Sequence, residues 1–291
     1  MRLKNAKGIL SSKNGMNLSR GCVHGCIYCD SRSLCYNMAH DFEDVEIKIN
    51  APQLLEEKLR SRRRPCMIVT GAMSDPYMPI DESLKITRDC VQIIEKYGFG
   101  LAIQTKSNLL LRDIDLLSNI NRKAKCVVAM TLTVFDEDLC KIIEPNVCTT
   151  RERFETLKIL RDRGIKTIVW LCPILPFIND TAENIRGILG YCIEAKVYGI
   201  LCFGMGLTLR EGSREYFYAM LDTHFPGLRA QYEKKYGVSY IVPSPNTSAL
   251  MDLFHKTCAE HNIVCGTEKL FEYMSALDEK SVIGQMELFG N

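Results

Sequence analysis

The chain has 291 residues and a formal net charge of +2, so no strong global field favours or excludes a nucleic acid as partner. Apolar residues make up 46% and charged residues 25%, which is the ordinary balance of a globular enzyme. No apolar run approaches the roughly 18 residues of a membrane span, and the basic N-terminal segment lacks the apolar stretch of a secretory signal, so we expect no membrane partner.

The predicted elements alternate between strands and helices. Runs of β-branched and apolar residues predict strands near residues 16–20, 67–70, 101–105, 127–130, 167–171 and 199–203. Residues 149–164 and 180–196 carry apolar side chains at helical spacing, and Asp180 followed by Glu183 is typical of a helix N-cap. This alternation indicates an α/β fold in which helices cover a parallel sheet, as in a partial or full barrel, where chemistry lies on the loops after the strands.

Three cysteines lie close together just after the first predicted strand. Cys22, Cys26 and Cys29 have the spacing C-x3-C-x2-C within the segment GCVHGCIYCD. The chain has fourteen cysteines. With no secretory signal they indicate a reducing compartment, where clustered cysteines are typical of metal ligands or catalytic groups. We therefore expect a cytoplasmic protein with a metal centre on this loop.

Two kinds of metal centre are compatible with three thiols. A zinc ion needs a fourth ligand, and His24 is a candidate, but reaching one ion from all four positions would strain so short a loop. A [4Fe–4S] cluster fits better, because three irons each take one thiolate and the fourth iron keeps an open site. Three buried cysteines that bind nothing are the remaining alternative.

The cysteine loop resembles the signature of the radical S-adenosylmethionine (SAM) superfamily, in which an aromatic residue, here Tyr28, precedes the third cysteine. The resemblance implies a partial (β/α)6 barrel with a C-terminal helical extension, holding a [4Fe–4S] cluster whose fourth iron is chelated by SAM. It also implies reductive cleavage of SAM to a 5′-deoxyadenosyl radical. An electron donor such as flavodoxin or ferredoxin is then an expected partner.

Four further blocks resemble the spore photoproduct lyase-like branch of that superfamily. They read VTGAMSDPYMPID, IQTKSNLLLRDIDLL, IIEPN and PILPFIND, and with the cysteine loop the resemblance covers about residues 17–210. The resemblance implies a SAM-binding set around the methionyl group, the ribose and the adenine, made of Tyr28, Ala72, Ser74, Asp75, Lys106, Ser107, Thr131 and Thr133.

Some of these residues have plainer alternatives. Asp75 is also typical of an Asx turn before Pro76. Lys106 could be a solvated lysine at the end of a strand, although a lysine there would also pair with a methionyl carboxylate. Thr131 and Thr133 could be ordinary strand residues.

One departure from that branch concerns the hydrogen donor. Spore photoproduct lyase carries a cysteine in the loop after the second strand, whereas residues 71–74 here contain no thiol. This argues against the same reaction, though not against the same initiation chemistry. Cys172, Cys202 and Tyr77 are substitute donors, although each is more typical of a core or lining residue.

The alternation of predicted strands and helices stops after residue 206. We predict a barrel domain at residues 1–206, a mostly helical extension at 207–278 and a flexible tail at 279–291. The tail resembles the pentapeptide by which bacterial DNA-processing proteins bind the replicative sliding clamp, with the anchors Gln285, Met286, Leu288 and Phe289. A chance tail, or one that packs on its own domain, is the alternative.

These observations predict a SAM-dependent radical enzyme with one [4Fe–4S] cluster that acts on nucleic acid, in the manner of DNA repair. A radical enzyme that modifies a peptide or a small metabolite is the first alternative. The second is a non-catalytic metal-binding protein that reads nucleic acid.

Overall fold

A six-stranded parallel sheet forms the centre of the molecule, which we describe from a computed structural model over residues 1–277. The strand order is β2-β5-β6-β7-β8-β9, so each strand after β2 lies beside its predecessor in this sheet. The strands are β2 (Gly15–Met16), β5 (Met67–Thr70), β6 (Gly100–Thr105), β7 (Cys126–Thr131), β8 (Lys166–Trp170) and β9 (Gly199–Leu201). With its crossover helices, the sheet is the expected partial barrel. The predicted tail and its clamp-binding segment lie outside the described residues.

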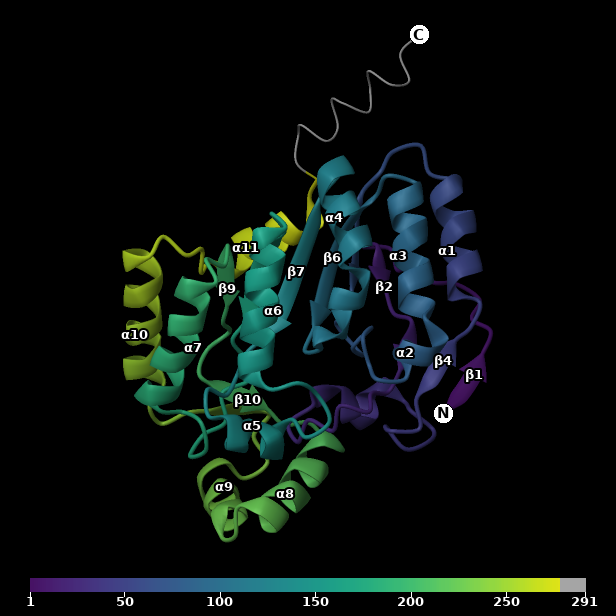
Figure 1. Cartoon of the computed structure of the whole chain (residues 1–291). Helices are drawn as coiled ribbons and strands as arrows, with labels where there is room; N and C mark the ends of the chain where they lie inside the picture. The colour runs from purple at the N-terminus through teal and green to yellow at the C-terminus, as the bar shows by residue number, and fades with distance from the viewer. Residues whose placement is uncertain (278–291) are drawn as a thin grey trace.

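Helices follow the strands and cover the outer face of the sheet (Figure 1). They are α1 (Ala51–Arg60), α3 (Ile86–Lys96), α4 (Ile114–Lys123), α6 (Thr150–Asp162), α7 (Ala182–Glu194) and, packed against α7, α10 (Thr247–Glu260). The inner face carries α11 (Thr267–Ser275). In β6, for example, Leu101 and Ile103 pack with the outer helices, whereas Ala102 clusters with Leu270 and Met274 of α11. Because both faces are covered, the strands read as continuous apolar runs rather than alternating ones.

Glycines at the beginning of two strands let the C-terminal segment come close to the sheet. A Cβ at Gly199 would lie 2.4 Å from Leu270 and 2.7 Å from the carbonyl oxygen of Val264. A Cβ at Gly100 would lie 2.7 Å from the side chain of Leu277. The end of the described chain therefore seals the inner face at the N-terminal ends of the strands.

The first predicted strand, residues 16–20, is divided between two sheets. Gly15–Met16 pairs with β5, whereas β3 (Ser19–Arg20) pairs antiparallel with β4 (Glu46–Lys48), which in turn pairs with β1 (Arg2–Lys4). The Lys48 backbone N–H donates to the Leu18 carbonyl, and the Lys48 Nζ donates to the Asn17 carbonyl. These bonds draw the chain off the central sheet, and hydrophobic periodicity does not report them.

The predicted N-cap of α7 is also displaced by one residue. Thr181, not Asp180, caps the helix by accepting from the Asn184 N–H. Asp180 is buried and accepts a hydrogen bond from Ser244.

The C-terminal part contributes two further helices, α8 (Ser213–His224) and α9 (Leu228–Tyr236), and a short strand pair, β10 (Gly206–Thr208) with β11 (Ile241–Pro243). Phe217 and Tyr232 of the two helices share one apolar cluster with Cys26 and Ile27 of the cysteine loop. The remaining elements are α2 (Asp81–Leu84), α5 (Glu137–Ile143) and the 3-10 turns Asp30–Arg32, Leu34–Tyr36 and Asn108–Asp113. Among residues 1–277, no helix is long and apolar enough to cross a membrane.

Candidate active site

The cysteine loop leaves β3 at the C-terminal side of the sheet and is held by backbone hydrogen bonds. Ile27 N–H donates to the Ile143 carbonyl, and Asn146 N–H donates to the His24 carbonyl. Gly21 has a φ of +85°, and a Cβ there would lie 2.3 Å from the Phe42 carbonyl oxygen. A side chain at this position would therefore push the loop off its support just before Cys22.

The charges of neighbouring cysteines act on the pKa values of Cys22 and Cys26. Burial raises the pKa of Cys22 to about 12, and the charges of Asp75 and Cys29 add to that rise. Burial also raises the pKa of Cys26 well above its usual value, against the attraction of Lys106. Thiols in this environment ionise only when a strong positive charge compensates them, as a metal centre does.

The donor set fits an iron–sulfur cluster better than a single ion. In the part of the chain that the structure describes, no three Cys, His, Asp or Glu side chains are placed to hold one metal ion. Thiolates that each bind a different iron need no such convergence. His24, the candidate fourth zinc ligand, turns its Nδ1 to Asp75 at 3.6 Å, and its buried Nε2 has no hydrogen-bond partner among residues 1–277.

Asp75 links the loops that follow β5 and β6. Its Oδ1 accepts from the Tyr77 N–H at 2.9 Å and from the Thr105 hydroxyl at 2.7 Å, and its Oδ2 accepts from the Lys106 N–H at 2.7 Å. The bond from Tyr77 forms the Asx turn before Pro76 that the sequence allowed. The carboxylate therefore joins two strand ends.

The other residues of the loop after β5 differ in their exposure. Ser74 is buried and bonds Ser19, with 2.8 Å between the two hydroxyl oxygens, whereas Ala72 is exposed. Gly71 has a φ of +99°, and a Cβ there would lie 1.9 Å from the Gln104 carbonyl oxygen. The turn after β5 therefore requires glycine at this position.

Lys106 extends from the end of β6 into the space beside the cysteine loop. Its Nζ lies 5.7 Å from the centre of the Tyr28 ring. Burial alone would lower the pKa of Lys106, but the charges of Cys26 and Glu144 outweigh it and raise the pKa. The ammonium is thus held charged next to the thiols, as a partner for a carboxylate would be. Ser107, by contrast, caps the following 3-10 turn by accepting from the Leu109 N–H.

A buried ion pair that the sequence reasoning missed supports this arrangement. Glu144 and Arg153 are fully buried, with 2.5 Å between the guanidinium Nη1 and the carboxylate Oε2. The Tyr28 hydroxyl donates to Glu144, and the Thr133 hydroxyl lies 3.5 Å from the same carboxylate. Arg153 also donates to the Thr131 carbonyl at 3.1 Å. The pair therefore gathers three of the predicted residues behind the cysteine loop.

The hydrogen-donor candidates are placed differently from one another. Cys172 is partly buried and close enough to Lys106 for its charge to act on the thiol, although burial dominates and raises the pKa of Cys172. Cys202 turns towards Met251 of α10, with 3.9 Å between the sulfur atoms. Tyr77 is completely buried in the outer core. Of the two cysteines, Cys172 is the one on which the charge of Lys106 acts.

Comparisons with known proteins agree with this geometry. The sequence model described as the radical SAM superfamily matches residues 16–189. The uncharacterized protein Rv2578c of Mycobacterium tuberculosis is 30% identical over 237 residues, which cover 79% of this chain and 69% of that protein. The uncharacterized protein MJ0683 of Methanocaldococcus jannaschii is 34% identical over 178 residues, covering 60% of this chain and 66% of that protein.

Solved structures with the same fold include spore photoproduct lyase. One mutant of that enzyme aligns with a TM-score of 0.63 at 15% identity, covering 89% of this chain and 77% of the other. Another, with bound AdoMet and dinucleoside spore photoproduct, has a TM-score of 0.60 at 14% identity, covering 84% of this chain and 73% of the other.

Proposed function

Because this chain belongs to the radical SAM superfamily, and so is an enzyme that uses a [4Fe–4S] cluster and SAM, we propose that it abstracts hydrogen from a nucleic acid. When bound, the cofactor pair supplies a 5′-deoxyadenosyl radical by reductive cleavage of SAM. The protein must bind, orient and shield that chemistry.

In this proposal each residue has a role that follows from its position. Cys22, Cys26 and Cys29 hold the cluster, and Lys106 binds the methionyl carboxylate, since its ammonium is kept charged beside them. Tyr28 is fixed by its bond to Glu144 and forms one wall of the SAM site. Flavodoxin or ferredoxin would supply the electron.

Support for a nucleic-acid substrate comes from the fold. The spore photoproduct lyase structure that aligns over 84% of this chain binds a dinucleoside lesion. The loop after β5 has methionine at position 73 and no thiol between residues 71 and 75. The reaction therefore ends differently from one that needs a cysteine there, and Cys172 is the candidate donor on which the charge of Lys106 acts.

The test is deuterium transfer from the substrate. We expect the reduced, reconstituted enzyme to form 5′-deoxyadenosine that carries deuterium when it is given SAM and a single-stranded oligonucleotide deuterated in its sugars and thymine methyl groups. Mass spectrometry of the nucleoside measures the transfer. Cys26→Ala is the negative control, and Cys258→Ala, which removes a buried thiol far from the loop, should behave like wild type.

Two other results would contradict the proposal. Undeuterated 5′-deoxyadenosine at saturating oligonucleotide would favour a peptide or a small metabolite as substrate. No SAM cleavage by protein with a complete cluster would favour a non-catalytic metal-binding protein.

A further inference from the structure

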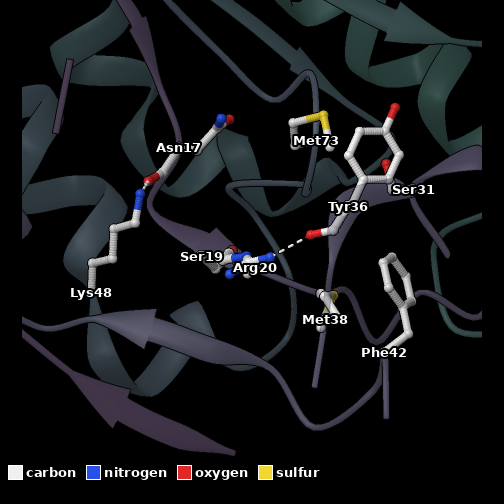
Figure 2. A pocket seen from close by; sticks show the side chains of 10 residues that line it. Asn17, Ser19, Arg20, Ser31, Tyr36, Met38, Phe42, Lys48 and Met73 are labelled. Atoms are coloured by element: carbon white, nitrogen blue, oxygen red, sulfur yellow. Dashed lines mark hydrogen bonds between the residues drawn. The ribbon is translucent and has the colours of Figure 1, made fainter. Parts of the chain in front are cut away.

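A cavity of about 220 Å³ lies immediately outside the cysteine loop (Figure 2). Its walls come from the small sheet and from both loops of the site: Asn17, Ser19, Arg20, Gly21, Ser31, Tyr36, Met38, Phe42, Lys48 and Met73. Gly21 precedes Cys22 directly, and Met73 precedes Ser74 and Asp75. The cavity is thus contiguous with the site, but it contains none of the residues assigned to the cluster or to SAM.

Two cations face this cavity without a carboxylate of their own. The Arg20 guanidinium donates to the carbonyls of Tyr36 and Asn37, and the Lys48 ammonium donates to the carbonyl of Asn17 (Figure 2). Neither side chain forms an ion pair with any residue in 1–277, although Glu46 lies near Lys48 and is itself bound to Lys4 and His40. Backbone carbonyls orient the two groups, and Glu46, which lies opposite Arg20 in the strand register and already binds Lys4 and His40, compensates their charges only in part.

The two charges act on each other. Burial and the charge of Arg20 lower the pKa of Lys48, and together they outweigh the attraction of Glu46. Two like charges at one cavity repel, so an anion between them would relieve that repulsion. The remaining lining is suited to the rest of such a ligand: Ser31 offers a hydroxyl group, and Phe42, Met38 and Met73 offer apolar and aromatic surface.

We propose that this cavity is a phosphate-ester subsite, which binds a phosphate of the substrate through Arg20 and Lys48 and places the adjoining nucleoside towards Met73 and the cysteine loop. Arginine and lysine paired on one anion are the usual donors to phosphate. The identification of that phosphate as part of a nucleic acid rests on the proposed function. A free nucleotide offers the same chemistry.

The test measures binding rather than turnover. Full-length protein is titrated against a fluorescein-labelled ten-residue oligothymidylate by anisotropy at several salt concentrations, with thymidine 5′-monophosphate and thymidine as unlabelled competitors. Arg20→Gln and Lys48→Gln should each weaken oligonucleotide binding roughly 5-fold, and each should lower the slope of log K against log salt by about 0.7, because each removes one phosphate contact. Thymidine has no phosphate, so it should displace the labelled oligonucleotide poorly, and equally so from wild type and from both variants.

Arg63→Gln is the matched control, since it removes the same charge from an exposed position at the N-terminal end of β5. Thermal unfolding of each variant shows whether it is folded. Within the described chain Lys48 Nζ donates to only one backbone carbonyl, so Lys48→Gln keeps the test decisive if Arg20→Gln unfolds the loop. Wild-type affinity of both cavity variants for the oligonucleotide and also for thymidine 5′-monophosphate would overturn the subsite.

The experiment separates this inference from the proposed function. Weakened binding of the monophosphate with unchanged binding of the oligonucleotide would keep the phosphate subsite and identify a free nucleotide as its ligand. Oligonucleotide binding that depends on Arg20 and Lys48, without deuterium transfer from the oligonucleotide, would keep the subsite and reject the reaction.

Discussion

At the scale of single residues, the site depends on buried charges that compensate one another. Although burial itself would raise the pKa of Glu144, Arg153 and Lys106 outweigh it and hold the pKa low. Glu144 in turn accepts from Tyr28, so the aromatic residue of the cysteine loop is positioned by an ion pair that reaches it from α6. The sequence drew attention to Tyr28 and to the IIEPN block, which contains Glu144. It did not show that Arg153 pairs with Glu144, because the two residues lie on separate elements.

This pair gives a prediction for stability. Arg153→Met should lower the free energy of unfolding by about 3–5 kcal/mol, because it leaves the buried Glu144 charge without its partner. Adding Glu144→Gln should recover part of that loss, since the amide is neutral and can still accept from Tyr28. Urea unfolding of the single and double variants measures both effects. Arg151→Met, an exposed position on the same helix, should change stability by less than about 0.5 kcal/mol. Equal losses in the single and double variants would contradict this view of the pair.

At the scale of elements, α7 shows how one helix uses two glycines differently. A Cβ at Gly187 would lie 2.2 Å from the ring of Phe135, whose own backbone N–H donates to Asn184 of the same helix. At Gly190, one turn later, a Cβ would meet nothing within 4 Å. The helical pattern at residues 180–196 predicted the helix, but the two glycines are indistinguishable in that pattern.

The two positions should therefore respond in opposite directions to alanine. Gly187→Ala should destabilise the protein by about 1–3 kcal/mol, because the Phe135 ring must move in a packed region. Gly190→Ala should stabilise it by about 0.5–1 kcal/mol, because alanine favours an exposed helical position. Thermal and urea unfolding of the two variants side by side provide the measurement. A stabilising Gly187→Ala would mean that the helix does not approach Phe135 as described.

At the scale of the whole molecule, the described chain ends far from the site. Leu277 lies beside Gly100, which begins β6, whereas Lys106 follows the other end of that strand (Figure 1). Leu277, the last described residue, therefore lies on the side of the barrel opposite the cysteine loop. We propose that Gln285, Met286, Leu288 and Phe289 bind a partner such as a sliding clamp.

We expect the full chain to be retained by an immobilised bacterial sliding clamp, and Leu288→Ala with Phe289→Ala to abolish that retention, because two apolar anchors dominate such short peptides. Formation of 5′-deoxyadenosine by the same double variant should equal that of wild type. Val282→Ala with Ile283→Ala, two apolar changes in the same tail outside the pentapeptide, is the control. Retention that ignores the changes at 288 and 289 would remove the clamp as a partner of this segment.

The cysteine spacing, the apolar strand runs and the helical periodicity determined the fold class and the superfamily, because these signals are local and the chemistry they serve tolerates few spacings. Tertiary structure decided which polar groups meet. It divided residues 16–20 between two sheets and turned Asp180 into a buried acceptor for Ser244. It paired Glu144 with Arg153 and brought Arg20 and Lys48 to one cavity. Such contacts join residues far apart in the chain, and their energies come from burial and charge compensation, which the periodicity of a single segment cannot express.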